Sequence, residues 1–270
     1  MFVFNMLFWV FLIFTLANSY RFAPIYKYVR HYENNYGINV VERCNIVKSK
    51  SPCILFLTGG SGGIPPQIYS HFMDNLATHG FSIYTPHSLF KNRTLLIKNL
   101  TCEFKEVIVV GHSSGGTTAI NYAKHHEIKK LILLDSVDTR IFSNEYRNKK
   151  HELRNLDSIL FLNARKSFKG SLNPPGIPFI PFLSVKPNIL NLKSTCKIYQ
   201  IEALEFGHAD ILDLHYSNLM HKSRICVGYH NRTFENMNDY HNWLTHIFYF
   251  YTKDNNKKLK KLPYPNIKWD

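Results

Sequence analysis

The sequence lacks the cysteine and glycine patterns that mark zinc and nucleotide sites. Its five cysteines form no CxxC pair, which argues against a zinc site. Neither a GxGxxG fingerprint nor a GK[S/T] phosphate loop is present, so a dinucleotide or P-loop site is not indicated. We also find no internal repeat and no low-complexity linker. A single domain of ordinary size fits the 270 residues, of which 45% are apolar.

Acidic residues are few, since 19 Asp and Glu stand against 33 Lys and Arg and leave a formal charge of +14. A basic balance can favour nucleic acid, anionic membranes or acidic substrates. The lysines are scattered, and the only dense run is Lys257-Lys258-Leu259-Lys260-Lys261, with no Arg/aromatic array beside it. We interpret this run as a solvated tail and expect no nucleic-acid partner.

The first 19 residues differ from the rest of the chain. Residues 2–16 are apolar except for Asn5 and Thr15, and Ala17-Asn18-Ser19 then offers small residues to a signal peptidase. The apolar run is too short for a typical membrane span. No Lys or Arg precedes it, so an uncleaved anchor is the alternative. We predict a secretory signal at 1–19 and a secreted or secretory-lumen protein.

Two further features agree with secretion. Glycosylation sequons begin at Asn92, Asn99 and Asn231. In an oxidising compartment the cysteines would form up to two disulfides and leave one free thiol, with a pairing that the sequence does not give. The cysteines are Cys44, Cys53, Cys102, Cys196 and Cys226.

Strands and helices alternate along the chain, which indicates a mostly parallel sheet covered by helices on both faces. We expect the α/β domain to span 20–252 and a basic polar tail to span 253–270. The predicted strands are 37–41, 53–57, 81–85, 107–110, 130–134, 158–163 and 197–203. The predicted helices are 67–78, 117–124 and 236–251.

The stretch Gly111-His112-Ser113-Ser114-Gly115 has the GxSxG pattern of a nucleophile elbow. A predicted strand precedes it and a small-residue helix follows, as the elbow requires. The serine makes a sharp turn there, and side chains two positions to either side would clash. Ser113 is therefore the candidate nucleophile of an α/β-hydrolase fold, placed at a helix N-terminus that favours negative charge.

A serine nucleophile needs a histidine base, and in this fold the order along the chain is Ser, acid, His. Only one later histidine, His208, follows a predicted strand and a glycine, so we assign it as the base. The others considered are His151, His215, His221, His230, His241 and His246. His112 adjoins the nucleophile, but we expect its side chain to face away and to be packed or supporting.

Few residues can serve as the acid of the triad, because no Asp or Glu occurs between Asp157 and Glu202. Asp157 precedes its strand and so lies on the wrong side of the sheet. Two candidates remain in Leu134-Asp135-Ser136-Val137-Asp138. We favour Asp135, directly at the strand end, over Asp138, which could cap or brace the loop. For the oxyanion hole we expect the backbone N–H groups of Gly60 and Ser114.

Three motifs together resemble the chlorophyllases, esterases that remove phytol from chlorophyll. They are the elbow Gly111–Gly116, the stretch Asp135–Asp138 and Gly207-His208-Ala209-Asp210-Ile211-Leu212-Asp213, which matches a GHxDxLD pattern. The likeness covers most of residues 50–252. It implies an esterase with the same triad of Ser113, Asp135 and His208, a mechanism that needs no metal or organic cofactor. Thr58 replaces a family histidine and Ser114 replaces an arginine, which leaves the substrate open.

Three functions remain compatible with these observations. The first is a secreted carboxylesterase acting on a small or lipophilic ester. The second is a lipase, phospholipid acyl hydrolase or polyester hydrolase, for which the basic surface would favour peripheral contact with anionic membranes. The third is a non-catalytic binding protein on the same fold. Repeated prolines in 173–183 would form either a buried loop or a rigid apolar wall beside the site.

Overall fold

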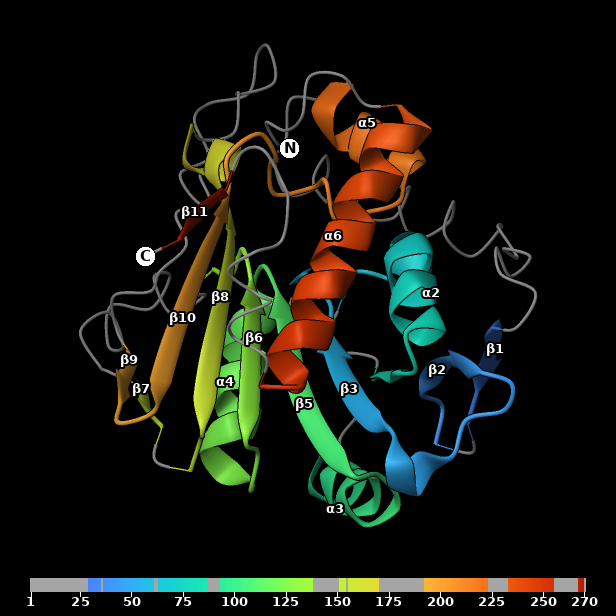
Figure 1. The fold of residues 1–270 in the computed structure, drawn as a ribbon. Helices are drawn as coiled ribbons and strands as arrows, with labels where there is room; N and C mark the ends of the chain where they lie inside the picture. The colour runs from blue at the N-terminus through green and yellow to red at the C-terminus, as the bar shows by residue number, and fades with distance from the viewer. Residues whose placement is uncertain are drawn as a thin grey trace, which may run out of the picture.

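The computed structural model describes residues 29–34, 36–60, 63–86, 93–137, 151–153, 155–169, 192–222, 233–254 and 267–269. A nine-stranded sheet runs through the molecule in the order β1-β2-β4-β3-β5-β6-β8-β10-β11 (Figure 1). Its strands are β1 (Val29–Glu33), β2 (Asn39–Arg43), β3 (Pro52–Leu57), β4 (Ser82–Thr85), β5 (Glu106–His112), β6 (Lys130–Leu134), β8 (Ser158–Ala164), β10 (Lys197–Ala203) and β11 (Ile267–Trp269). A separate parallel pair joins β7 (His151–Leu153) to β9 (Leu192–Ser194).

The strand directions identify the fold. All neighbours from β4 to β10 are parallel, whereas β2 is antiparallel to β1 and β4, and β11 is antiparallel to β10. The α/β-hydrolase arrangement has an antiparallel β2 beside a parallel sheet, and it has the nucleophile elbow directly after β5. In this sheet β4 lies between β2 and β3, so the chain crosses over from β3 to β4 and returns to β5 on the other side of β3. The chain therefore has the α/β-hydrolase fold that the sequence predicted.

Helices cover both faces of the sheet, as Figure 1 shows. The α-helices are α2 (Ser70–Thr78), α3 (Arg93–Glu103), α4 (Gly115–His125), α5 (Leu214–Lys222) and α6 (Phe234–Thr252). Successive side chains of β5 point to opposite faces of the sheet, so this strand contributes to two separate apolar clusters. Ile108 and Val110 belong to the apolar cluster with α2 and α6, and Val107 and Val109 belong to the cluster with α3 and α4. A strand buried on both faces explains the continuous apolar run in the sequence.

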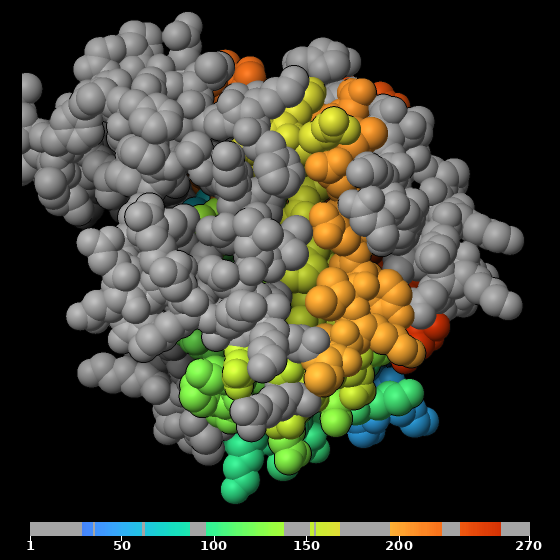
Figure 2. All heavy atoms as spheres, turned by 90° about the vertical axis from the view of Figure 1, so that its left-hand side faces the viewer, coloured from blue at the N-terminus to red at the C-terminus, as the bar shows by residue number. Residues whose placement is uncertain are grey.

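The C-terminal tail differs from the prediction. Residues 267–269, expected to lie outside the domain, form β11 and pair with Ile201–Ala203 of β10. Strand β10 is therefore not the last strand of the sheet. It lies on one side of the molecule next to β8, where its first residues are exposed (Figure 2). Pairing with β11 satisfies backbone groups of β10 that an edge strand leaves open, and three residues are too few to produce a periodic signal.

Other elements were not predicted, or have different bounds. Strand β1 and helices α3 and α5 were missed, and the expected helix 67–78 is a 3₁₀ turn, η3 (Pro66–Tyr69), followed by α2. The expectation of up to two disulfides and one free thiol is wrong, because Cys44, Cys53 and Cys102 are all free and leave at most one pair among the five cysteines. Cys44 and Cys102 are exposed, and Cys53 is buried in β3.

Several predictions fall on residues outside the described ranges: the signal at 1–19, the proline-rich stretch 173–183, Cys226, and the sequons at Asn92 and Asn231. Asn99 lies in α3 and is partly exposed. In the part of the chain that the structure describes, no helix combines the length and apolar character needed to span a membrane.

Candidate active site

Ser113 lies at the sharp turn between β5 and α4, in the left-handed backbone region with φ +55°. A non-glycine residue there is strained and persists only where its surroundings hold it. Its N–H donates to the carbonyl of Leu134 at 3.1 Å, and its carbonyl accepts the N–H of Val137 at 2.9 Å. The loop after β6 therefore holds the elbow in place.

The two glycines of the elbow have no room for a side chain. A Cβ on Gly111 would lie 2.6 Å from the carbonyl oxygen of Gly115, and one on Gly115 would lie 2.3 Å from the carbonyl oxygen of Leu57. Both contacts are with backbone, which cannot rotate away. The steric requirement inferred from the sequence is confirmed at both positions.

Ser113, His208 and Asp135 form a continuous hydrogen-bonded line. The Ser113 Oγ lies 2.8 Å from His208 Nε2, and His208 Nδ1 lies 2.6 Å from Asp135 Oδ2. Because a carboxylate only accepts, Nδ1 carries the proton and Nε2 is left to accept from the serine hydroxyl. The side chains of His208 and Asp135 are 12% and 6% exposed, so bulk water scarcely competes for these bonds.

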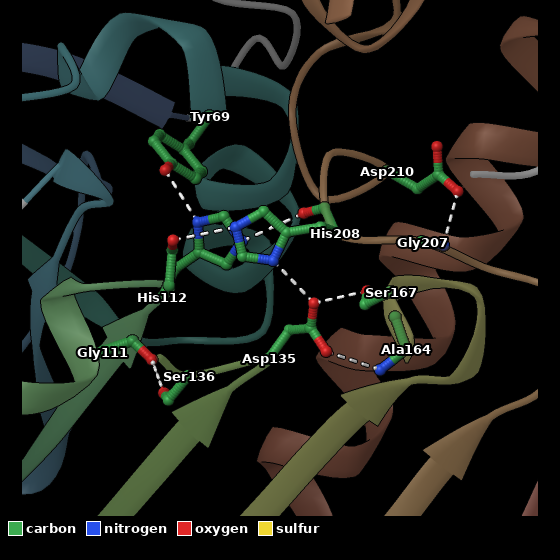
Figure 3. Close-up of polar contacts among 11 residues, drawn as sticks. Tyr69, Gly111, His112, Asp135, Ser136, Ala164, Ser167, Gly207, His208 and Asp210 are labelled. Carbon is green, nitrogen blue, oxygen red and sulfur yellow. Dashed lines mark hydrogen bonds and ion pairs between the residues drawn. The ribbon is translucent and has the colours of Figure 1, made fainter. Parts of the chain in front are cut away.

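Asp135 follows β6 directly and also has a positive φ, of +44°. Its Oδ1 accepts the backbone N–H of Ala164 at 3.0 Å, and its Oδ2 accepts the hydroxyl of Ser167 at 2.6 Å in addition to His208 (Figure 3). Of the two acid candidates, the structure places Asp135 against the histidine, and Asp138 lies outside the described residues. Ser167, on η5 (Arg165–Lys169), was missed because no sequence pattern links it to β6.

His208 follows β10 in the loop before α5, as the sequence predicted, and its ring lies between Ser113 and Asp135. The other candidates lie on different elements. They are His151 in β7, His215 and His221 in α5, and His241 and His246 in α6, while His230 is outside the described residues.

His112 is packed, as expected, but it contacts the candidate base. It is 3% exposed, and its ring stacks on that of His208 with centroids 4.8 Å apart. Its Nδ1 lies 2.9 Å from the hydroxyl of Tyr69, and its Nε2 lies 3.1 Å from the carbonyl oxygen of His208 (Figure 3). Burial, with the nearby His208 as a second cause, holds the pKa of His112 well below its usual value of 6.5.

The glycine turn after β3 lies against the nucleophile. A Cβ on Gly59 would be 3.4 Å from the Cβ of Ser113, and Gly60 has φ +62°. Thr58, which stands where the resemblance leads one to expect histidine, is buried and donates its hydroxyl to the Ile64 carbonyl at 2.7 Å. This bond closes the turn. The backbone of the turn can therefore approach an ester bound at Ser113, and the predicted donor Ser114 is at the N-terminus of α4.

Two acidic residues of the GHxDxLD stretch hold the loop that carries His208. Asp210 is fully buried, and it accepts the N–H of Gly207 at 2.8 Å and the hydroxyl of Ser217 at 3.0 Å. Asp213 accepts the N–H of His71 at 3.0 Å and so ties the loop to α2. Burial raises the pKa of Asp213 to about 8. Both residues lie in the motif, although their bracing contacts were not predicted.

A metal centre is not formed by the described residues, since no group of three or more His, Cys, Asp or Glu side chains gathers there. The hydrogen bonds of the site instead join Ser113, His208 and Asp135 to one another.

No protein-family model matches the sequence, and no curated protein is similar to it. Among solved structures, dienelactone hydrolase from Anabaena variabilis is 13% identical over 73% of this chain and 97% of its own, with a TM-score of 0.41. A thermostable esterase from Pseudomonas putida is 14% identical over 57% and 69%, with a TM-score of 0.39. An inferred esterase from Staphylococcus aureus is 14% identical over 48% and 52%, with a TM-score of 0.36, so this chain spans about half of that protein. The fold assignment therefore rests on the strand order and the elbow.

Proposed function

We propose that this protein is a serine hydrolase of carboxylic esters, with Ser113 as nucleophile, His208 as general base and acid, and Asp135 as the carboxylate that orients the imidazole. The observation that carries the proposal is the hydrogen-bonded line from the Ser113 hydroxyl through His208 to Asp135, with bonds of 2.8 and 2.6 Å. An isolated serine hydroxyl is a weak nucleophile, and this arrangement is the one that activates it.

The first half of the reaction forms an acyl-enzyme. The Ser113 Oγ attacks the ester carbonyl carbon while its proton passes to His208 Nε2. The carbonyl oxygen becomes an oxyanion, which we assign to the backbone N–H groups of Gly60 and Ser114. The proton on His208 then passes to the departing alkoxide, so the alcohol leaves neutral and the acyl group stays on Ser113.

The second half releases the acid. His208, again neutral, takes a proton from a water molecule, whose oxygen attacks the acyl carbon. Collapse of this second tetrahedral species returns the proton to Ser113 Oγ and frees the carboxylic acid. Asp135 holds a negative charge throughout, which stabilises the imidazolium in both halves.

A lipophilic ester is the substrate class we propose, and a phospholipid is the alternative. The first is supported by the resemblance of three motifs to the chlorophyllases, and the second by the charge of +14, which favours adsorption to anionic lipid. Release of chlorophyllide from chlorophyll supports the first. Fatty-acid release from anionic phospholipid vesicles, without chlorophyllide, supports the second.

The test of the function is hydrolysis of p-nitrophenyl esters of increasing chain length by the wild type and Ser113→Ala. We expect loss of roughly 10⁶ in kcat on removal of the nucleophile. Ser51→Ala, in the turn before β3 and away from Ser113 and His208, is the matched control and should retain most activity. A Ser113→Ala protein with wild-type turnover would refute the proposal.

We further propose that the chain enters the secretory pathway through residues 1–19. Expression in a secreting host, followed by sequencing of the N-terminus of the exported protein, tests this. A new N-terminus near residue 20 supports a cleaved signal, an intact membrane-bound chain supports the anchor, and a chain retained in the cytoplasm contradicts both.

A further inference from the structure

We propose that Tyr69 and His112 form a neutral hydrogen-bonded bridge that positions the general base and the glycine turn relative to each other. This inference rests on the proposed function, because it concerns how that site is held. Tyr69 and His112 are positioning residues, since neither contacts the Ser113 hydroxyl through any hydrogen bond found in the described residues.

The direction of each bond in the bridge follows from its acceptors. The His208 carbonyl oxygen can only accept, so the His112 Nε2 that lies 3.1 Å away carries a proton. A neutral His112 then has an unprotonated Nδ1, which accepts the Tyr69 hydroxyl at 2.9 Å. The Tyr69 oxygen in turn accepts the N–H of Gly59 at 3.2 Å. The bridge therefore runs from Gly59 through Tyr69 and His112 to the backbone of His208.

The bridge joins two parts of the site that are distant in sequence. Gly59 precedes Gly60 in the turn assigned to the oxyanion, and His208 is the assigned base, 96 residues beyond His112. Tyr69 and His112 are 0% and 3% exposed, so water does not replace these bonds when they are broken. Small displacements of either part cost rate, because catalytic groups must meet the transition state with close tolerance.

His112 must also stay uncharged. Its ring stacks on His208 at 4.8 Å between centroids, and His208 becomes positively charged when it takes the serine proton. A second positive charge at that distance would oppose this step. Protonation at Nδ1 would, in addition, remove the acceptor for the Tyr69 hydroxyl. The lowered pKa of His112 agrees with a ring that stays neutral.

Tyr69→Phe is the direct test, because it removes one oxygen and keeps the ring packed edge-on against Phe56. It leaves the Gly59 N–H and the His112 Nδ1 without their partner. The matched control is Tyr251→Phe, on α6. Tyr251 is 1% exposed, and its hydroxyl lies 2.7 Å from that of Ser158, so it is equally buried and bonded but far along the sheet.

With p-nitrophenyl butyrate we expect Tyr69→Phe to lower kcat about tenfold or more while KM stays within about twofold. Tyr251→Phe should lower the urea midpoint but leave kcat within about twofold. His112→Gln places an amide near Nε2 and should restore part of the activity lost in His112→Ala. The double variant of Tyr69→Phe with His112→Ala should lose less than the product of the single losses, because both remove one bridge.

The tautomer of His112 can be measured directly by nitrogen NMR on wild-type protein with ¹⁵N-labelled histidine. This measurement requires neither enzymatic activity nor a variant that folds. We expect His112 to remain the neutral Nε2–H tautomer from pH 8 to pH 5. An Nδ1–H tautomer, or a ring that titrates near pH 6.5, overturns the bridge. So does an active wild type whose Tyr69→Phe variant has unchanged kcat while Ser113→Ala is inactive. A wild type inert towards both esters and alkyl fluorophosphonates overturns the proposed function alone, and the His112 tautomer still decides whether the bridge is formed.

Discussion

Asp135→Asn changes one atom of the site, and the structure predicts its consequence. The two oxygens of the Asp135 carboxylate have different hydrogen-bond partners. Oδ1 accepts the backbone N–H of Ala164 at 3.0 Å, and Oδ2 accepts His208 Nδ1 at 2.6 Å and the Ser167 hydroxyl at 2.6 Å. An asparagine must keep its oxygen towards Ala164, because an amide nitrogen there would face a backbone N–H that can only donate.

The asparagine NH₂ therefore faces His208, and it donates to Nδ1. The imidazole is then forced into the Nε2–H tautomer, which donates to Ser113 instead of accepting its proton. Loss of the correct tautomer in a Ser-His-Asp triad costs about 10⁴ in kcat, or about 5 kcal/mol of transition-state stabilisation. KM should change little, because no group that binds the ester has moved.

The assay is steady-state hydrolysis of p-nitrophenyl butyrate at pH 7.5, with urea unfolding to show that the variant is folded. Asp138→Asn tests the other candidate acid, and Asp157→Asn, an exposed position before β8, is the matched control. A folded Asp135→Asn protein with kcat within about tenfold of wild type would refute the assignment. If Asp138→Asn were the inactive variant, Asp138 would be the acid.

Three other changes have calculable effects. Gly115→Ala places a Cβ 2.3 Å from the Leu57 carbonyl oxygen, so we expect about 2–3 kcal/mol lower stability by urea unfolding; an unchanged midpoint would contradict the elbow geometry. Ser167→Ala removes one donor from Asp135, and kcat should fall about three- to tenfold with the fold intact; no change would show that this bond is dispensable. Burial lowers the pKa of His241 to about 3, so below pH 6.5 the unfolded chain binds a proton there that the folded protein does not. The free energy of unfolding should fall with falling pH between 6.5 and 3, and His241→Gln should weaken this slope by about 1.4 kcal/mol per pH unit; an unchanged slope would contradict the buried neutral ring.

The sequence predicted those elements whose evidence lies within one short segment of the chain. The apolar run before Gly111 and the glycines around Ser113 predicted β5 and the elbow, because strand burial and turn sterics act over a few neighbouring residues. His208 was placed by the strand and glycine before it. Among the described residues, α3 was missed although Leu96, Ile97 and Leu100 are buried at helical spacing, because the surrounding residues are polar.

Contacts between distant segments could not be predicted in the same way. Tyr69 lies 43 residues before His112, and Ser167 lies 32 residues after Asp135, with no motif joining either pair. Their hydrogen bonds exist only because the parallel strands bring the loops together at one edge of the sheet. The same holds for β11, whose three residues gain their strand conformation from β10.

The most direct test of the central proposal is the reaction of the folded protein with an alkyl fluorophosphonate, followed by intact mass and peptide mapping. Attack by an activated serine displaces fluoride and leaves one phosphonyl group on the nucleophile. We expect one adduct per chain, on Ser113, which is absent from Ser113→Ala and much slower to form in Asp135→Asn. A folded wild-type protein that forms no adduct, or one that carries it at another residue, would contradict the assignment of Ser113 as the nucleophile.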